Sequence, residues 1–74
     1  MHKMISGEDC IKILCKYFGF HVVRQRGSHI ILRKDFPEGA IGTVVPNHKE
    51  LKTGTLRGIL ELAKVDEEEF SKHF

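Results

Sequence analysis

Hydrophobic residues recur with a helical period near the N-terminus. They are Ile11, Leu14, Cys15 and Phe18. Their spacing of i, i+3, i+4 and i+7 is that of the apolar stripe of an amphipathic helix. Ser6 is a suitable N-cap with Asp9 three residues later, and Gly19 suits a left-handed C-cap. The pattern therefore predicts a helix over residues 7–18.

The same spacing returns near the C-terminus, at Leu56, Ile59, Leu60 and Ala63. Thr53 or Thr55 is expected to cap this second helix. Asp66 and Glu69 then form a capping box that opens a short terminal helix within residues 66–74, anchored by Phe70. These signals predict one longer and one short helix after residue 52.

The polar and apolar positions between the helices alternate as they do in strands. Two β-prone runs, "FHVVRQR" (20–26) and "SHIILRK" (28–34), meet at Gly27, which indicates a tight hairpin or a glycine bulge. "DFPEG" (35–39) is a turn signal, and "AIGTVV" (40–45) is a third strand that ends at Pro46. Strands that follow one another with short connections should form an antiparallel sheet.

These elements predict a single α+β domain over residues 1–74, in the order α-β-β-β-α with a short extra C-terminal helix. Residues 1–4 carry no periodic signal and are expected to be disordered. Each longer helix has one apolar stripe, so both should cover the same face of the three-stranded sheet. The other face of the sheet is then open.

Strand alternation places His29 on that open face. His29, Ile31 and Arg33 share one side of their strand, while the more apolar Ser28, Ile30 and Leu32 share the side expected to face the helices. In the preceding strand, Arg24 and Arg26 alternate with the same parity as Phe20 and Val22. We expect a bulge at Gly27 to turn these arginines away from the interior.

The net charge of +2 is unevenly distributed, because residues 66–69, "DEEE", hold four of the ten acidic residues. Residues 1–65 contain eleven Lys and Arg against six Asp and Glu, a balance of +5. A basic body suits a polyanion partner, although a basic surface can also serve solubility alone. The acidic run is either a helix N-terminal charge set or a segment that masks the basic surface or meets a protein partner.

Several classes of function are disfavoured. Cys10 and Cys15 lie about 140° apart around one helix, which predicts two reduced thiols that behave as small hydrophobes. The five histidines show no ligand-like spacing, so neither a metal nor another cofactor is expected. No apolar run approaches the roughly 20 residues of a membrane span and no signal peptide is visible, which favours a cytoplasmic protein.

His29 is the candidate for chemistry. Histidine exchanges protons near neutral pH, and a general base can activate the 2′-hydroxyl of RNA to attack the adjacent phosphodiester. Gly27 and Ser28 would shape the approach to it. Five basic residues are candidates for phosphate contacts: Arg26, Arg33, Lys49, Lys52 and Arg57. His48 is either a second proton-transfer group or phosphate contact, or it closes its loop onto the start of the second helix, which is the role we favour.

Four segments together resemble the HicA family of mRNA interferase toxins. They are Gly27-Ser28-His29, then Val45-Pro46-Asn47-His48, "ELKTGTLRGIL" (50–60) and "EEEF" (67–70), and the likeness runs over residues 5–72. The resemblance implies a fold like that of double-stranded-RNA-binding domains, and a type II toxin that cleaves mRNA without sharp sequence preference and arrests translation in a stress response. It also implies that His29 is catalytic, and that a HicB antitoxin binds the toxin and blocks this histidine.

Two functions remain open beside that of the toxin. The chain is either the metal-independent endoribonuclease that the resemblance implies, acting alone as a monomer or held in a heteromer with its antitoxin, or a non-catalytic RNA-binding module of the same fold. A protein-interaction domain whose open sheet is covered by a partner is the third possibility. "RKDFPEGAIG" (33–42) is more acidic and glycine-rich than expected at a basic RNA-facing turn, which bears on substrate preference.

Overall fold

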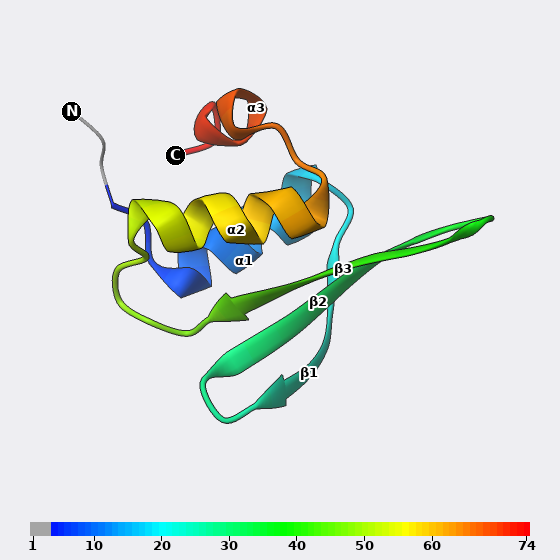
Figure 1. Ribbon diagram of the computed structural model, residues 1–74, viewed down its shortest axis with the longest axis horizontal. Helices are drawn as coiled ribbons and strands as arrows, with labels where there is room; N and C mark the ends of the chain where they lie inside the picture. The colour runs from blue at the N-terminus through cyan, green and yellow to red at the C-terminus, as the bar shows by residue number, and fades with distance from the viewer. Residues whose placement is uncertain (1–3) are drawn as a thin grey trace.

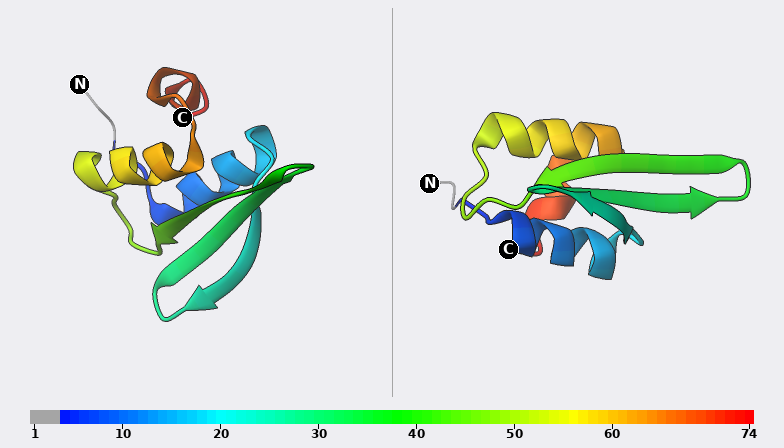
Figure 2. Two further views of the ribbon diagram at one scale, coloured as in Figure 1. Left: turned by 45° about the vertical axis from the view of Figure 1, so that its right-hand side comes forward. Right: turned by 90° about the horizontal axis from the view of Figure 1, so that it is seen from below.

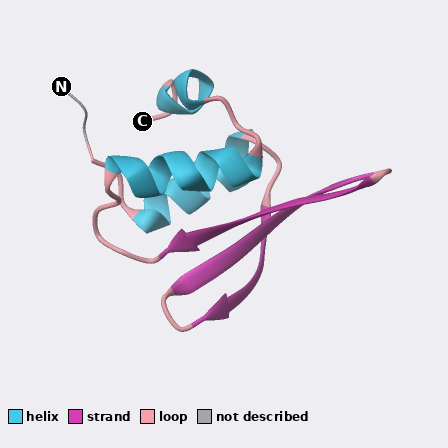
Figure 3. Cartoon of the chain, viewed as in Figure 1, coloured by secondary structure: helices cyan, strands magenta, loops and turns pink. Residues whose placement is uncertain are grey.

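The computed structural model describes residues 4–74, and its order of elements is the predicted one (Figures 1 and 3). The elements are α1 (Gly7–Tyr17), β1 (His21–Arg26), β2 (His29–Phe36), β3 (Gly39–Pro46), α2 (Thr53–Ala63) and α3 (Glu67–Ser71). Of the segment expected to be disordered, residues 1–3 lie outside the described range. Within that range, no helix is long and apolar enough to cross a membrane.

Local hydrogen bonds explain where the helices begin. The Ser6 hydroxyl accepts from the Asp9 amide at 3.0 Å, and the Asp66 carboxylate accepts from the Glu69 amide at 3.1 Å, so both predicted caps are confirmed. The predicted threonine caps of α2 are wrong. Its N-cap is Lys52, whose side chain makes no capping bond, because Thr53 already belongs to the helix.

The three strands form one antiparallel sheet in the order β1-β2-β3. Gly27 and Ser28 alone connect β1 to β2, and Gly27 has a φ of 58°, as at the first central position of a type II′ turn. The predicted tight hairpin is confirmed, but the bulge is not at Gly27. The register shifts between Val22 and Arg24 instead, so Val23 is the extra residue.

Helices α1 and α2 lie side by side over one face of the sheet, and α3 packs on the side of this pair that is away from the sheet (Figures 1 and 2). The sheet contributes Ile30, Leu32 and Val45 to the buried core, and the Thr43 hydroxyl donates to the Ile59 carbonyl of α2 at 2.8 Å. The predicted stripe of α2 packs here as expected. The stripe of α1 is shifted: Cys10 and Ile13 are buried with Leu14, whereas Ile11, Cys15 and Phe18 are partly buried at its edge.

Candidate functional site

His29 is the first residue of β2 and is exposed on the open face of the sheet. The next residue, Ile30, is 7% exposed and points to the helices, as strand alternation requires. Within residues 4–74, the His29 imidazole makes no hydrogen bond and no ion pair. The predicted exposed position is confirmed, and the ring is free to meet a ligand from solvent.

Arginines flank His29 on the same face. Arg26 is the partner directly opposite His29 across β1 and β2, and Arg24 pairs with Ile31, the next residue of β2 on that side. Within the described range, neither arginine forms an ion pair. Arg24 is absent from the sequence-based candidates, although its alternation with Arg26 is a visible signal.

The bulge explains why these arginines face solvent while Phe20, with the same parity, is 4% exposed. The extra residue, Val23, reverses the alternation between the two halves of β1. No bulge at Gly27 is therefore required to turn the arginine side chains to the open face. The predicted consequence is right, and its predicted location is wrong.

Arg33 shares the open face but lies in a different environment. Its Nε is 3.1 Å from the Asp35 carboxylate, and the same carboxylate is 3.7 Å from His21 Nε2. Arg33 lies four positions after His29 in β2, a separation of about 13 Å at roughly 3.3 Å per residue. Asp35 offsets the charge of Arg33, so the free positive charge on this face is concentrated near His29.

The turn beside His29 is held from two sides. The Gln25 side-chain amide donates to the Gly27 carbonyl at 2.8 Å, and the Asn47 amide donates to the Ser28 carbonyl at 2.6 Å. The space where a Cβ on Gly27 would stand has no atom within 4 Å. The turn is thus fixed by hydrogen bonds while the space beside Gly27 is open.

The loop after β3 brings further candidates to this end of the sheet, where β2 begins and β3 ends (Figure 1). His48, Lys49 and Lys52 are all exposed in it. The His48 backbone closes the loop, as favoured, but its carbonyl accepts from the Gly7 amide of α1 at 2.8 Å rather than binding the start of α2. The His48 imidazole has no side-chain partner within residues 4–74, so its chemical role stays a prediction.

Arg57 is set apart from these residues. Its Nε lies 3.4 Å from a Glu67 carboxylate oxygen of α3, and α3 is on the far side of the helix pair from the sheet. The structure therefore places Arg24 and Arg26 beside His29, and Lys49 and Lys52 in the connection between β3 and α2, whereas Arg33 and Arg57 each lie beside a carboxylate elsewhere.

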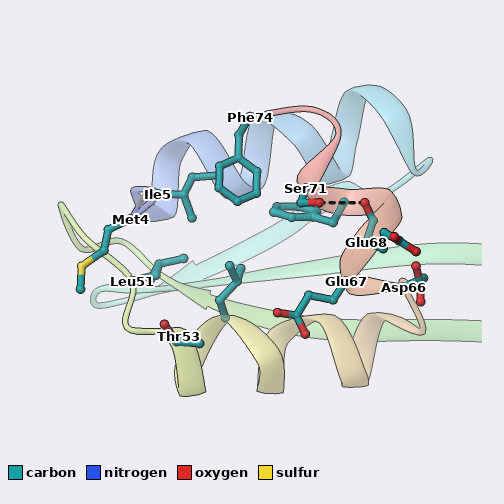
Figure 4. Close-up of a pocket in the computed structure, with 11 residues that line it drawn as sticks. Met4, Ile5, Leu51, Thr53, Asp66, Glu67, Glu68, Ser71 and Phe74 are labelled. Carbon is teal, nitrogen blue, oxygen red and sulfur yellow. Dashed lines mark hydrogen bonds between the residues drawn. The ribbon is translucent and has the colours of Figure 1, made fainter. Parts of the chain in front are cut away.

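A hollow in the described surface lies away from His29. It has a volume of about 490 Å³ and lies between α3, the start of α2 and the segment before α1, with Ile5, Leu51 and Phe70 among its lining residues (Figure 4). None of the predicted site residues lines it. The candidate site is accordingly an open surface, which suits an extended polymer better than a small molecule.

Neither thiol is placed for chemistry at this surface. Cys10 and Cys15 are free, and burial raises the pKa of Cys10 to about 12 and raises that of Cys15 as well. Among residues 4–74 there is no cluster of three or more His, Cys, Asp or Glu side chains that could hold a metal ion. The chemistry available here is that of imidazole and basic side chains.

Comparison with known families gives one match, to the family described as HicA toxin of bacterial toxin–antitoxin, over residues 7–65. The match covers most of the 74-residue chain and includes β2, β3 and the loop that follows. The chain belongs to this family, and the resemblance inferred from its motifs is confirmed. A comparison with curated proteins finds no match. Membership of a toxin–antitoxin family supports a toxin role and implies an antitoxin partner.

Proposed function

We propose that this chain is the toxin of a type II toxin–antitoxin system and acts as a metal-independent endoribonuclease on mRNA in the cytoplasm, with His29 as its catalytic residue. One observation carries the proposal: an exposed imidazole that has no side-chain partner among residues 4–74 and lies directly opposite Arg26 on a solvent-facing sheet. Family membership supports the toxin role, and the chemistry of this face supplies the reaction.

The reaction follows from what an imidazole can do to RNA. His29 removes the proton from a 2′-hydroxyl, whose oxygen attacks the adjacent phosphorus while the bond from phosphorus to the 5′-oxygen breaks. The products are a 2′,3′-cyclic phosphate and a 5′-hydroxyl, and the leaving oxygen takes a proton from an acid. His48 is the candidate for that acid, or for a phosphate contact. A positioned general base contributes typically about 10²–10⁴-fold to the rate.

The basic side chains hold the polymer. Arg26 and Arg24 stabilise charge on the phosphate beside His29, and Lys49 and Lys52 extend the basic surface along the loop. Contacts of this kind are to the backbone, so they give affinity without reading the sequence of the RNA. Weak sequence preference is the expected result.

The same face is the proposed docking surface for a HicB-like antitoxin. It also carries apolar side chains: Val44 is 38% exposed and Ile31 beside it is half-buried. A protein that covered these residues would exclude RNA from His29. Inhibition then requires no change in the toxin's own fold.

The decisive experiment compares the wild type with His29→Gln on a labelled RNA in the presence of EDTA. The wild type should cleave it, and the variant should be slower by about 10²–10⁴-fold. An RNA with deoxyribose at the cleaved nucleotide should resist both proteins, because it has no nucleophile.

His21→Gln is the matched control, since His21 is exposed on the same face but lies beside Asp35 at the other end of the strand. It should cut at the wild-type rate. Cleavage by folded His29→Gln at that same rate would disprove the catalytic assignment.

A non-catalytic RNA-binding module is the second candidate, and one observation favours it. Within the described residues no carboxylate orients the His29 ring, unlike the base in the serine-protease arrangement. This candidate requires salt-sensitive binding of RNA that is recovered intact after long incubation with the wild type.

A further inference from the structure

The turn that carries His29 is connected to helix α1 by a series of backbone hydrogen bonds. The Ser28 carbonyl accepts from the Asn47 amide at 2.6 Å, and the next residue, His48, donates to Pro46 at 2.9 Å. The His48 carbonyl in turn accepts from the Gly7 amide at 2.8 Å. The loop over residues 46–48 therefore lies between the first residue of α1 and the turn beside His29.

Gly7 is in unusually close contact with this loop. A Cβ at this position would overlap the Pro46 carbonyl oxygen, and it would come within 3.1 Å of the Pro46 carbonyl carbon and 3.2 Å of the Asn47 Cα. The φ of Gly7 is not positive, so its backbone conformation alone does not require glycine. The requirement comes from contact with backbone atoms, which cannot rotate away as the end of a side chain would.

We propose that Gly7 is a positioning residue for His29: the absence of its side chain lets α1 hold the 46–48 loop where Asn47 fixes the Ser28 turn. This inference rests on the proposed role of His29 as a general base. Because no side chain orients the His29 ring within residues 4–74, its place relative to the phosphate depends on the backbone at the start of β2. Gly7 itself touches no substrate in this arrangement.

The test is Gly7→Ala, measured by single-turnover cleavage of RNA. The added methyl group displaces the loop, and the displacement reaches Ser28 through Asn47. A misplacement of about 1 Å at a reacting group can cost on the order of 10²-fold, so kcat should fall roughly 10- to 100-fold. KM should change less, because Arg24 and Arg26 are on β1 and keep their positions.

Gly58→Ala is the matched control. Gly58 is in the middle of α2, and a Cβ there meets nothing within 4 Å. Alanine is the better helix former, so this variant should unfold at a higher temperature and cut RNA at the wild-type rate. The double variant, Gly7→Ala with Gly58→Ala, should regain thermal stability without regaining kcat. Recovery of kcat together with stability would show that Gly7 acts on stability alone and would overturn the proposal.

Asn47→Pro tests the same coupling by a second substitution, one that leaves the sequence of α1 unchanged. It removes the amide that donates to Ser28, and the strand conformation of Pro46 before it is compatible with a following proline. Its kcat should fall as in Gly7→Ala. An unchanged kcat in Asn47→Pro would also overturn the proposal, even if Gly7→Ala does not fold.

A spectroscopic readout separates this inference from the proposed function. In Gly7→Ala the ring signals of His29 and the amide exchange of Asn47 should change, while both stay as in the wild type in Gly58→Ala. If the wild type does not cut RNA, the catalytic role fails but the coupling can still be observed. If cleavage is present and these signals are unchanged in Gly7→Ala, the coupling fails and the catalytic role stands.

Discussion

At the scale of single residues, the histidines within residues 4–74 differ in what surrounds them. The His21 ring is 3.7 Å from the Asp35 carboxylate, and the His73 ring stacks on Tyr17 with 3.9 Å between centroids. The rings of His29 and His48 have no such partner in this range, and both belong to the end of the sheet where Arg26 lies. The proposed proton transfer requires an accessible ring without such a partner, which His21 and His73 do not offer.

Cys10 gives a prediction about pH. Burial raises the pKa of its thiol from about 9 to about 12 in the folded protein, so the folded state keeps a proton that the unfolded chain releases in this window. Its contribution to stability is complete below about pH 9 and is lost as the pH rises, at about 1.4 kcal/mol per pH unit. Urea unfolding between pH 8 and pH 11, under reducing conditions, measures this slope.

Cys10→Ala should be less stable at pH 8 but should lose stability less steeply above pH 9. Cys15→Ala serves as its control, because Cys15 is only partly buried, and it should retain most of the wild-type slope. Equal slopes in all three proteins would show that the Cys10 thiol does not carry the alkaline loss.

At the scale of elements, local signals predicted what local chemistry decides. Ser6 and Asp66 identified two helix starts because each cap is a bond over three residues. The bulge lies at Val23 and not at Gly27, where the sequence predicted it. β-Branched residues fit any strand position, so only the pairing with β2 reveals the extra residue.

The candidate site, like the elements, was predicted where the signal is local. Exposure of His29 follows from alternation along one strand, which the sequence displays directly. The contact of Gly7 with Pro46 joins segments about 40 residues apart in the chain, and a glycine at the first helical position carries no sign of it. Long-range contacts of backbone atoms leave no periodic pattern, so they had to be observed.

Helix α3 depends on one side chain. Five residues are too few for an isolated helix, so its stability comes from packing of Phe70, which is fully buried with its ring 6.2 Å from that of Phe18. Phe70→Ala should cost about 3–5 kcal/mol of unfolding free energy, a large share for a domain of this size. Urea denaturation followed by circular dichroism measures the loss. Phe74→Ala, at an exposed ring, should cost about 1 kcal/mol or less.

At the scale of the whole molecule, the arginines beside His29 and the acidic run lie on opposite sides. Arg24 and Arg26 lie on the open face of the sheet, whereas the acidic run that begins at Asp66 belongs to α3, beyond the helix pair (Figure 1). Asp66 caps α3, Glu67 pairs with Arg57, and Glu69 pairs with Lys72 at 3.0 Å. The local use of these acids as a helix N-terminal charge set is thus supported by geometry, whereas within the described part of the chain they make no ion pair with the arginines beside His29.

Binding experiments distinguish these two uses of the acidic run. Each helix layer is about 10 Å thick, which exceeds the Debye length of about 8 Å at 0.15 M salt, so Glu68 should be screened from RNA on the open face. In the His29→Gln background, Glu68→Gln should change the dissociation constant for a single-stranded RNA by less than about twofold. Arg26→Gln should weaken binding and lower the slope of log K against log salt by about 0.7. Tighter binding by Glu68→Gln at 0.15 M salt, as large as the loss in Arg26→Gln, would instead assign the acidic run to masking, because only a charge near the bound phosphates acts at that salt concentration.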